Sequence, residues 1–184
     1  MQTMFDINPS YFGIHPWDIH QWWGIFTTVF VHGNAEHLFS NITALAGLLA
    51  LLFLFYDKVA VLILIGSWIF TGVLMFFIAR PGFFHIGASG VVYAISVFLF
   101  TAGVLSHNRS LKIISLIVAI YYGSMIWGLI PLDTKVSWDG HLSGAIAGVL
   151  LSLLYVKFYP SKKIKNQRHF MENEDDDEYG EFGN

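Results

Sequence analysis

Long apolar segments without charged residues dominate the chain from residue 37 to residue 156. Five segments contain no Asp, Glu, Lys or Arg, namely residues 37–56, 59–79, 83–106, 113–130 and 141–156. Each approaches or exceeds about 20 residues, the length that an α-helix needs to cross the hydrocarbon core of a membrane. None has a polar outer face, so the segments are not explained as buried helices of a soluble protein. We therefore predict an all-α, polytopic membrane helical bundle with five spans.

Composition and charge assign the ends of the chain to the space outside the bilayer. Only 12% of the residues are charged, against roughly 25% in soluble domains. Most of the 13 acids lie after residue 171, so the net charge of −3 belongs to the tail, and we expect no nucleic-acid partner. We expect residues 160–184 to form a disordered cytoplasmic tail. Residues 1–36 contain two prolines and many aromatic residues, which predicts an extracytoplasmic loop, either at the membrane interface or an ordinary external one.

The Lys and Arg residues beside the segments predict the orientation of the chain. Successive connections alternate between the two sides of the membrane. One side receives eight of the 10 Lys and Arg residues, and the other side receives only Arg80 and Lys135. The positive-inside rule assigns the richer side, which includes the C-terminus, to the cytoplasm. We expect an integral, multi-pass protein of the cell (inner) membrane.

Polar side chains within the apolar segments are functional candidates, because placing them in lipid is costly. They gather at the beginnings of the first, third and fifth segments. The first group is His37 and Asn41, the second is Ser89 with Tyr93, and the third is His141. Because spans alternate in direction, these three beginnings lie on the same side of the membrane. The groups are therefore expected to share one depth near the outer leaflet.

A serine, two histidines and an amide at one depth can supply a nucleophile, a base and donors to an oxyanion. The predicted spans contain no Asp or Glu, which favours a Ser–His dyad over a triad and excludes an aspartyl protease. The same absence argues against a proton-coupled transporter. The chain has no HExxH motif and no cysteine, so neither a metalloprotease nor a cysteine nucleophile is expected. We expect no metal and no cofactor.

Small residues predict that the third and fifth segments pack closely. Gly140, Gly144 and Gly148 recur every four residues, and Gly90 offers a similar patch beside Ser89. Such a stripe lets two helix backbones approach each other. Close packing here would bring the histidine of the fifth segment near the serine of the third.

The order of these motifs resembles the rhomboid intramembrane serine proteases. The residues that carry the resemblance are His32, His37-x-x-x-Asn41, Gly87-Ala-Ser89-Gly90 with Tyr93, and His141 with Gly144 and Gly148. The resemblance covers roughly residues 26–159 and implies a rhomboid-like transmembrane domain at residues 37–159. The family core has six spans, and its His-x-x-x-Asn helix is normally the second. The sequence therefore predicts a rhomboid-like bundle that lacks the family's first helix. Many members also carry Trp-Arg before this helix, where the present chain has Trp23-Gly24.

The resemblance also implies a role for each residue. Ser89 would be the nucleophile and His141 the general base, while His37, Asn41 and the backbone N–H of Ser89 would form the oxyanion hole. The supporting residues would be Gly87 in the loop that shapes the site, Tyr93 against the His141 ring, and the packing glycines Gly144 and Gly148. The substrates would be membrane proteins, cut in or near a transmembrane helix within the lipid bilayer.

Two other functions are compatible with the same sequence features. A non-catalytic membrane adaptor on the same fold would bind transmembrane helices without cutting them. Loss of the first helix favours this alternative, and the presence of Ser89, His141, His37 and Asn41 argues against it. A small transporter or channel would need a polar path across the bilayer, whereas the polar residues lie at one depth. An intramembrane serine endopeptidase is therefore the predicted function.

Overall fold

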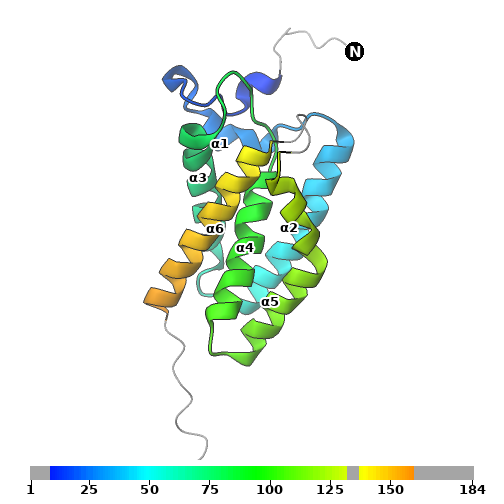
Figure 1. Cartoon of the computed structure of the whole chain (residues 1–184), viewed down its shortest axis with the longest axis vertical. Coiled ribbons are helices and arrows are strands. Elements are labelled where there is room, and N and C mark those ends of the chain that lie inside the picture. The colour runs from blue at the N-terminus through cyan, green and yellow to red at the C-terminus, as the bar shows by residue number, and fades with distance from the viewer. Residues whose placement is uncertain (1–8, 132–136, 160–184) are drawn as a thin grey trace, which may run out of the picture.

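The computed structural model describes residues 9–131 and 137–159, and within these ranges the chain is a helical bundle (Figure 1). The long helices are α2 (Ala35–Phe55), α3 (Ala60–Ile78), α4 (Ser89–Leu105), α5 (Arg109–Tyr122), which continues as the 3-10 helix η4 (Gly123–Leu129), and α6 (Trp138–Phe158). Before them lie the short elements η1 (Pro9–Phe12), η2 (Ile19–Gln21), α1 (Gly24–Thr27) and η3 (Thr28–Phe30). The described residues form no strand, only an isolated bridge between Ile14 and His85. The predicted all-α class is confirmed.

Four helices of the described chain are long and apolar enough to cross a membrane. They are α2, α3, α5 with η4, and α6, each of 19 to 21 residues. The apolar helix α4 has 17 residues, which is the lower limit for a span. A helix of this length can still be a span, because α4 lies in the middle of the bundle and packs against each of the other four long helices (Figure 1).

Helix α4 is central because small and apolar residues cover all of its faces. Eleven of its residues are buried, among them Ile95, Phe98 and Leu99. Its closest neighbour is α6, on which Gly144 faces the carbonyl of Gly90 and Gly148 faces that of Ala94. A side chain at either glycine would overlap backbone atoms of α4, so the glycine stripe sets how close the two helices come.

The helices begin and end at residues that differ from the predicted ones, and two differences matter for the site. The third segment was predicted to begin at residue 83, but α4 begins at Ser89. Pro81 and two glycines with positive φ, Gly82 (84°) and Gly87 (109°), keep residues 80–88 out of a helix. The last segment was predicted to begin at residue 141, but α6 begins at Trp138. The prediction that no acid lies within a span was therefore wrong, since Asp139 is in the first turn of α6 and is buried.

The segment before α2 is tied to the loop between α3 and α4. Ile14 and His85 exchange both backbone hydrogen bonds, at 2.9 and 2.8 Å, and Gly87 N–H donates to the carbonyl of Thr28 at 3.0 Å. Tyr11, Phe12, Trp17 and Trp22 expose their rings on this segment, but whether they lie in the membrane interface stays a prediction. The same holds for the domain boundaries at residues 36 and 159. The predicted disordered tail, residues 160–184, lies outside the described residues.

Candidate active site

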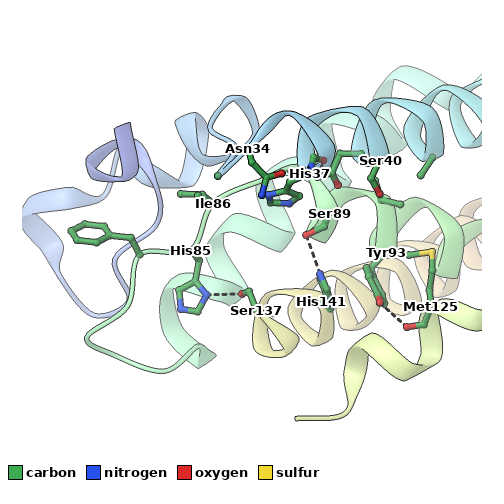
Figure 2. Close-up of a pocket in the computed structure, with 15 residues that line it drawn as sticks. Asn34, His37, Ser40, His85, Ile86, Ser89, Tyr93, Met125, Ser137 and His141 are labelled. Atoms are coloured by element: carbon green, nitrogen blue, oxygen red, sulfur yellow. Dashed lines mark hydrogen bonds between the residues drawn. The ribbon is translucent and has the colours of Figure 1, made fainter. Parts of the chain in front are cut away.

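The beginnings of α4 and α6 bring Ser89 and His141 into contact. Ser89 is the first residue of α4, and His141 lies in the first turn of α6. The Ser89 Oγ and His141 Nε2 atoms are 3.0 Å apart (Figure 2). The two residues are 52 positions apart in the sequence, and they meet because α4 and α6 run side by side in the same direction.

The carbonyl of Gly128 determines how the His141 ring is protonated. His141 Nδ1 lies 2.9 Å from this carbonyl oxygen. A carbonyl oxygen can only accept, so Nδ1 carries the proton in this hydrogen bond. In the neutral ring Nε2 is then an acceptor, and the Ser89 hydroxyl donates to it. This is the arrangement that a general base requires when it removes a proton from a serine.

Tyr93 holds the flat face of the His141 ring. The two rings stack with their centroids 4.2 Å apart and their planes inclined by 13°. The Tyr93 hydroxyl donates a 2.6 Å hydrogen bond to the carbonyl of Met125 in η4 (Figure 2). Helices α4 and α6 and the 3-10 helix η4 therefore all contribute to the orientation of one imidazole.

A cavity of about 580 Å³ adjoins Ser89 and His141. Its wall is formed by the beginnings of α2, α4 and α6, the loop before α4 and part of η4 (Figure 2). The lining residues are Gly33, Asn34, His37, Ser40, Asn41, Ala44, Phe84, His85, Ile86, Ser89, Val92, Tyr93, Met125, Ser137 and His141. The polar groups expected at one depth thus face one cavity, which also has apolar walls that can accept a side chain.

His37 and Asn41 lie across the cavity on the first turns of α2. Asn34 caps this helix, and its side chain accepts a 2.8 Å hydrogen bond from His37 N–H. The Asn41 amide donates to the His37 carbonyl at 2.9 Å, which leaves its second N–H to act as a donor. Gly87 lies directly against the His37 ring, since a Cβ at this glycine would be 2.7 Å from His37 Nε2. Gly87 also has a positive φ, which glycine adopts more readily than other residues do. Glycine is therefore the residue that fits this position.

The His32 ring packs edge-on against His37, with the centroids 5.0 Å apart. Burial lowers the pKa of His32, and the neighbouring His37 lowers this pKa further.

The described residues contain no group of three or more His, Cys, Asp or Glu side chains that could hold a metal ion.

Four residues beside the cavity were missed by the sequence analysis. They form a polar network of Arg80, His85, Ser137 and Asp139. His85 was open to recognition, because it is a polar residue inside an uncharged segment. Asp139 was missed because the last span was drawn from residue 141. The bond to the Gly128 carbonyl involves a backbone atom, which leaves no signal in the sequence.

His85 is the buried histidine of this network. Its ring is 3% exposed, and its Nδ1 lies 2.6 Å from Ser137 Oγ (Figure 2). Burial lowers the pKa of His85, although the Asp139 carboxylate nearby favours the charged form. The neutral ring is therefore the favoured form of His85 near neutral pH.

Known proteins resemble this chain over most of its length. The family model of the Rhomboid domain matches residues 19–158. An uncharacterized protein of Mycobacterium tuberculosis is 32% identical over 176 residues, which cover 89% of this chain and 69% of the relative. An uncharacterized protein of Mycobacterium bovis gives the same values. One of Mycobacterium leprae is 32% identical over 151 residues, 78% of this chain and 59% of the relative. No solved structure gives a significant match.

The match to the domain family agrees with the arrangement of the helices. Four helices of the described chain are long and apolar enough to span a membrane, and the Rhomboid domain covers all five long helices. The protein is an integral membrane protein, as predicted. With the family model and the relatives in agreement, the chain belongs to the rhomboid family, most of whose members are intramembrane serine proteases.

Proposed function

We propose that this protein is an intramembrane serine endopeptidase that uses Ser89 as nucleophile and His141 as general base. The single observation that carries the proposal is the 3.0 Å contact between Ser89 Oγ and His141 Nε2. Membership of the rhomboid family supports the same reaction class. The substrates are membrane proteins, hydrolysed in or near a transmembrane segment.

The proposed reaction follows from the donors and acceptors of the two side chains. The Ser89 oxygen attacks the scissile carbonyl while His141 Nε2 takes the hydroxyl proton. The imidazolium then gives this proton to the leaving amine, which produces an acyl-enzyme on Ser89. Water attacks the ester by the same sequence of proton transfers and releases the second product. The Gly128 carbonyl, 2.9 Å from His141 Nδ1, steadies the imidazolium that forms in each half of the reaction.

The negative charge on the tetrahedral intermediate needs donors on the opposite wall of the cavity. We assign this role to His37, Asn41 and the backbone N–H of Ser89. The two side chains lie on successive turns of α2 and line the cavity that contains Ser89. Each donor in a site with little water contributes on the order of 3 kcal/mol to the reduction of the barrier. Gly87 allows His37 to approach the site, because any side chain at this position would collide with the His37 ring.

We further propose that the protein lies in the cell membrane with its C-terminus in the cytoplasm. Arg109, Lys112 and Lys157 lie at the end of the bundle opposite the cavity, which agrees with the positive-inside rule. The cavity then opens near the outer surface, where water for the second half of the reaction is available. Fusions of a periplasm-active and a cytoplasm-active reporter to the C-terminus test the orientation.

A serine-reactive probe tests the proposed nucleophile directly. A fluorophosphonate should label the purified wild-type protein in detergent, and Ser89→Ala and His141→Ala should each abolish labelling. Both variants should reduce cleavage of a transmembrane reporter substrate by at least about 1000-fold. Ser40→Ala is the matched control, since Ser40 lines the same cavity, whereas the partners of the two His141 ring nitrogens are Gly128 and Ser89. Equal labelling of the wild-type protein and Ser89→Ala would refute the assignment.

The same experiment distinguishes a protease from an adaptor that binds helices without cutting them. An adaptor would retain a transmembrane peptide, yet neither react with the probe nor cleave the reporter. Ser89→Ala would then bind the peptide as tightly as the wild-type protein does. A protease instead cleaves the peptide, and its Ser89→Ala variant binds the peptide but leaves it intact.

A further inference from the structure

A single buried carboxylate joins the loop before Ser89 to the helix that carries His141. Asp139 is 2% exposed and lies two residues before His141, in the first turn of α6. Its Oδ2 accepts hydrogen bonds from the backbone N–H and the Nε–H of Arg80, both at 3.0 Å. Arg80 is the residue at which the loop 80–88 leaves α3. The carboxylate therefore binds the first residue of the loop twice.

The second carboxylate oxygen of Asp139 reaches the middle of the same loop. Ser137 Oγ donates to Asp139 Oδ1 at 3.2 Å. Ser137 Oγ also lies 2.6 Å from His85 Nδ1, and His85 Nε2 lies 3.4 Å from the Arg80 carbonyl oxygen. His85 Nδ1 is itself 3.6 Å from Asp139 Oδ1. Four residues before Ser89, the loop is thus held to α6 a second time.

Arg80 also sits between aromatic rings of the loop and the helix. Its guanidinium carbon is 5.5 Å from the centroid of the Phe83 ring and 5.3 Å from that of the Trp138 ring. Both distances allow cation–π attraction. The side chain of Arg80 is 41% exposed, whereas the carboxylate that it binds is buried. Removing the carboxylate would therefore leave several donors without their acceptor, which is costly for a buried group.

We propose that Asp139 is a positioning residue, which fixes the loop that leads to Ser89 against the first turn of the helix that carries His141. The inference rests on the proposed function, in which the distance between these two side chains matters. The two ring nitrogens of the base have other partners, since His141 Nδ1 lies 2.9 Å from the Gly128 carbonyl oxygen and Nε2 lies 3.0 Å from Ser89 Oγ. Its effect is on the relative position of nucleophile and base, for which an error of about 1 Å can cost on the order of 100-fold in rate.

Two substitutions at Asp139 measure this effect on the reaction. Asp139→Ala removes every acceptor, so kcat should fall by about 10- to 100-fold, and KM should change by less than about threefold because Asp139 is not in the cavity lining. Asp139→Asn keeps one oxygen and should give an intermediate kcat. Asp57→Ala is the matched control, since Asp57 is exposed in the turn between α2 and α3. Each kcat is referred to the number of molecules that the fluorophosphonate labels at completion, so that unfolded protein does not count.

Hydrogen exchange measures how firmly Asp139 holds the loop 80–88, and this measurement does not depend on catalytic activity. In Asp139→Ala the amides of residues 80–88 should exchange faster by roughly tenfold, while the core of α4 keeps its protection. If Asp139→Ala does not fold, Asp139→Asn and Arg80→Lys supply the same comparison. An unchanged kcat per labelled molecule, or loop exchange equal to that of the wild-type protein, would overturn the proposal. A wild-type protein that neither labels nor cleaves would instead refute the proposed function, and the exchange rates would still decide whether Asp139 holds the loop.

Discussion

The close contact between α4 and α6 predicts a specific defect in the Gly144→Ala variant. The added Cβ would overlap the Gly90 carbonyl oxygen and lie 2.9 Å from the carbonyl carbon. Cβ atoms do not come within about 3.0 Å of another heavy atom, so α6 has to withdraw from α4 by about 1 Å to relieve the overlap with the oxygen. His141 lies one turn before Gly144 on the same helix face. The withdrawal therefore stretches the 3.0 Å contact between Ser89 and His141 to about 4 Å, beyond the usual range of a hydrogen bond.

The expected magnitudes follow from this displacement. We expect kcat of Gly144→Ala to fall by about 10- to 100-fold, since a 1 Å error costs on the order of 100-fold. The free energy of unfolding should decrease by up to about 2 kcal/mol, because overpacking costs roughly 1 to 3 kcal/mol and the better helix propensity of alanine returns about 1 kcal/mol. Cleavage of the reporter substrate gives kcat and KM, and thermal unfolding in detergent gives the stability.

A second glycine supplies the control for Gly144→Ala. Gly123, the first residue of η4, has no atom within 4 Å of the position of an added Cβ. Gly123→Ala therefore reports the effect of the substitution without a collision, and both kcat and stability should stay close to those of the wild-type protein. Wild-type values for Gly144→Ala would refute the reasoning, since the contact with Gly90 would then not determine the distance between Ser89 and His141.

Two further substitutions test other parts of the site. Asn41→Ala should lower kcat by about 10- to 1000-fold with little change in KM or melting temperature, because the amide N–H that is not bonded to the His37 carbonyl is proposed to donate only to the oxyanion. A collapse of stability with normal activity per folded molecule would make Asn41 structural. Burial lowers the pKa of His85 in the folded protein below its ordinary value of 6.5. As the pH falls below 6.5, His85 of the unfolded state therefore takes up a proton before that of the folded state does, and the free energy of unfolding should decrease. Melting curves between about pH 5 and 8 should show this loss in the wild-type protein and in the exposed His107→Gln control, and a smaller loss in His85→Gln.

The helices and the approximate depth of the polar groups could be predicted from the sequence. A segment such as residues 59–79 carries no charge and has apolar residues on every face. A helix satisfies its own backbone, but these apolar faces must lie in lipid or against protein, so the segment is either a membrane span or a fully buried helix. Direction alternates from span to span, which requires that His37, Ser89 and His141 begin their helices on one side. These conclusions need only local composition and the count of spans.

The beginnings of the helices were less predictable, because the residues near them respond to tertiary contacts. Phe83 and Phe84 have the apolar character of the following helix, but Gly87 and the hydrogen bonds with Ile14 and Thr28 hold this stretch as a loop. At the start of α6, an acid next to a charge-free segment marked a boundary in the sequence. In the structure Asp139 is inside the helix, because Arg80 supplies the donors that its buried carboxylate needs.

Residue types and their order determined that this chain is a rhomboid-like bundle with a serine and a histidine at a common depth. That information is local, since hydrophobicity and spacing act on each segment separately. The 3.0 Å approach of Ser89 to His141 was decided by the tertiary structure, through the packing of Gly90 on Gly144 and the bond from His141 to the Gly128 carbonyl. The orientation of the imidazole depends on a backbone oxygen from another segment, and a backbone oxygen is the same in every residue. No pattern of side chains in the sequence could therefore have specified the contact between His141 and the Gly128 carbonyl.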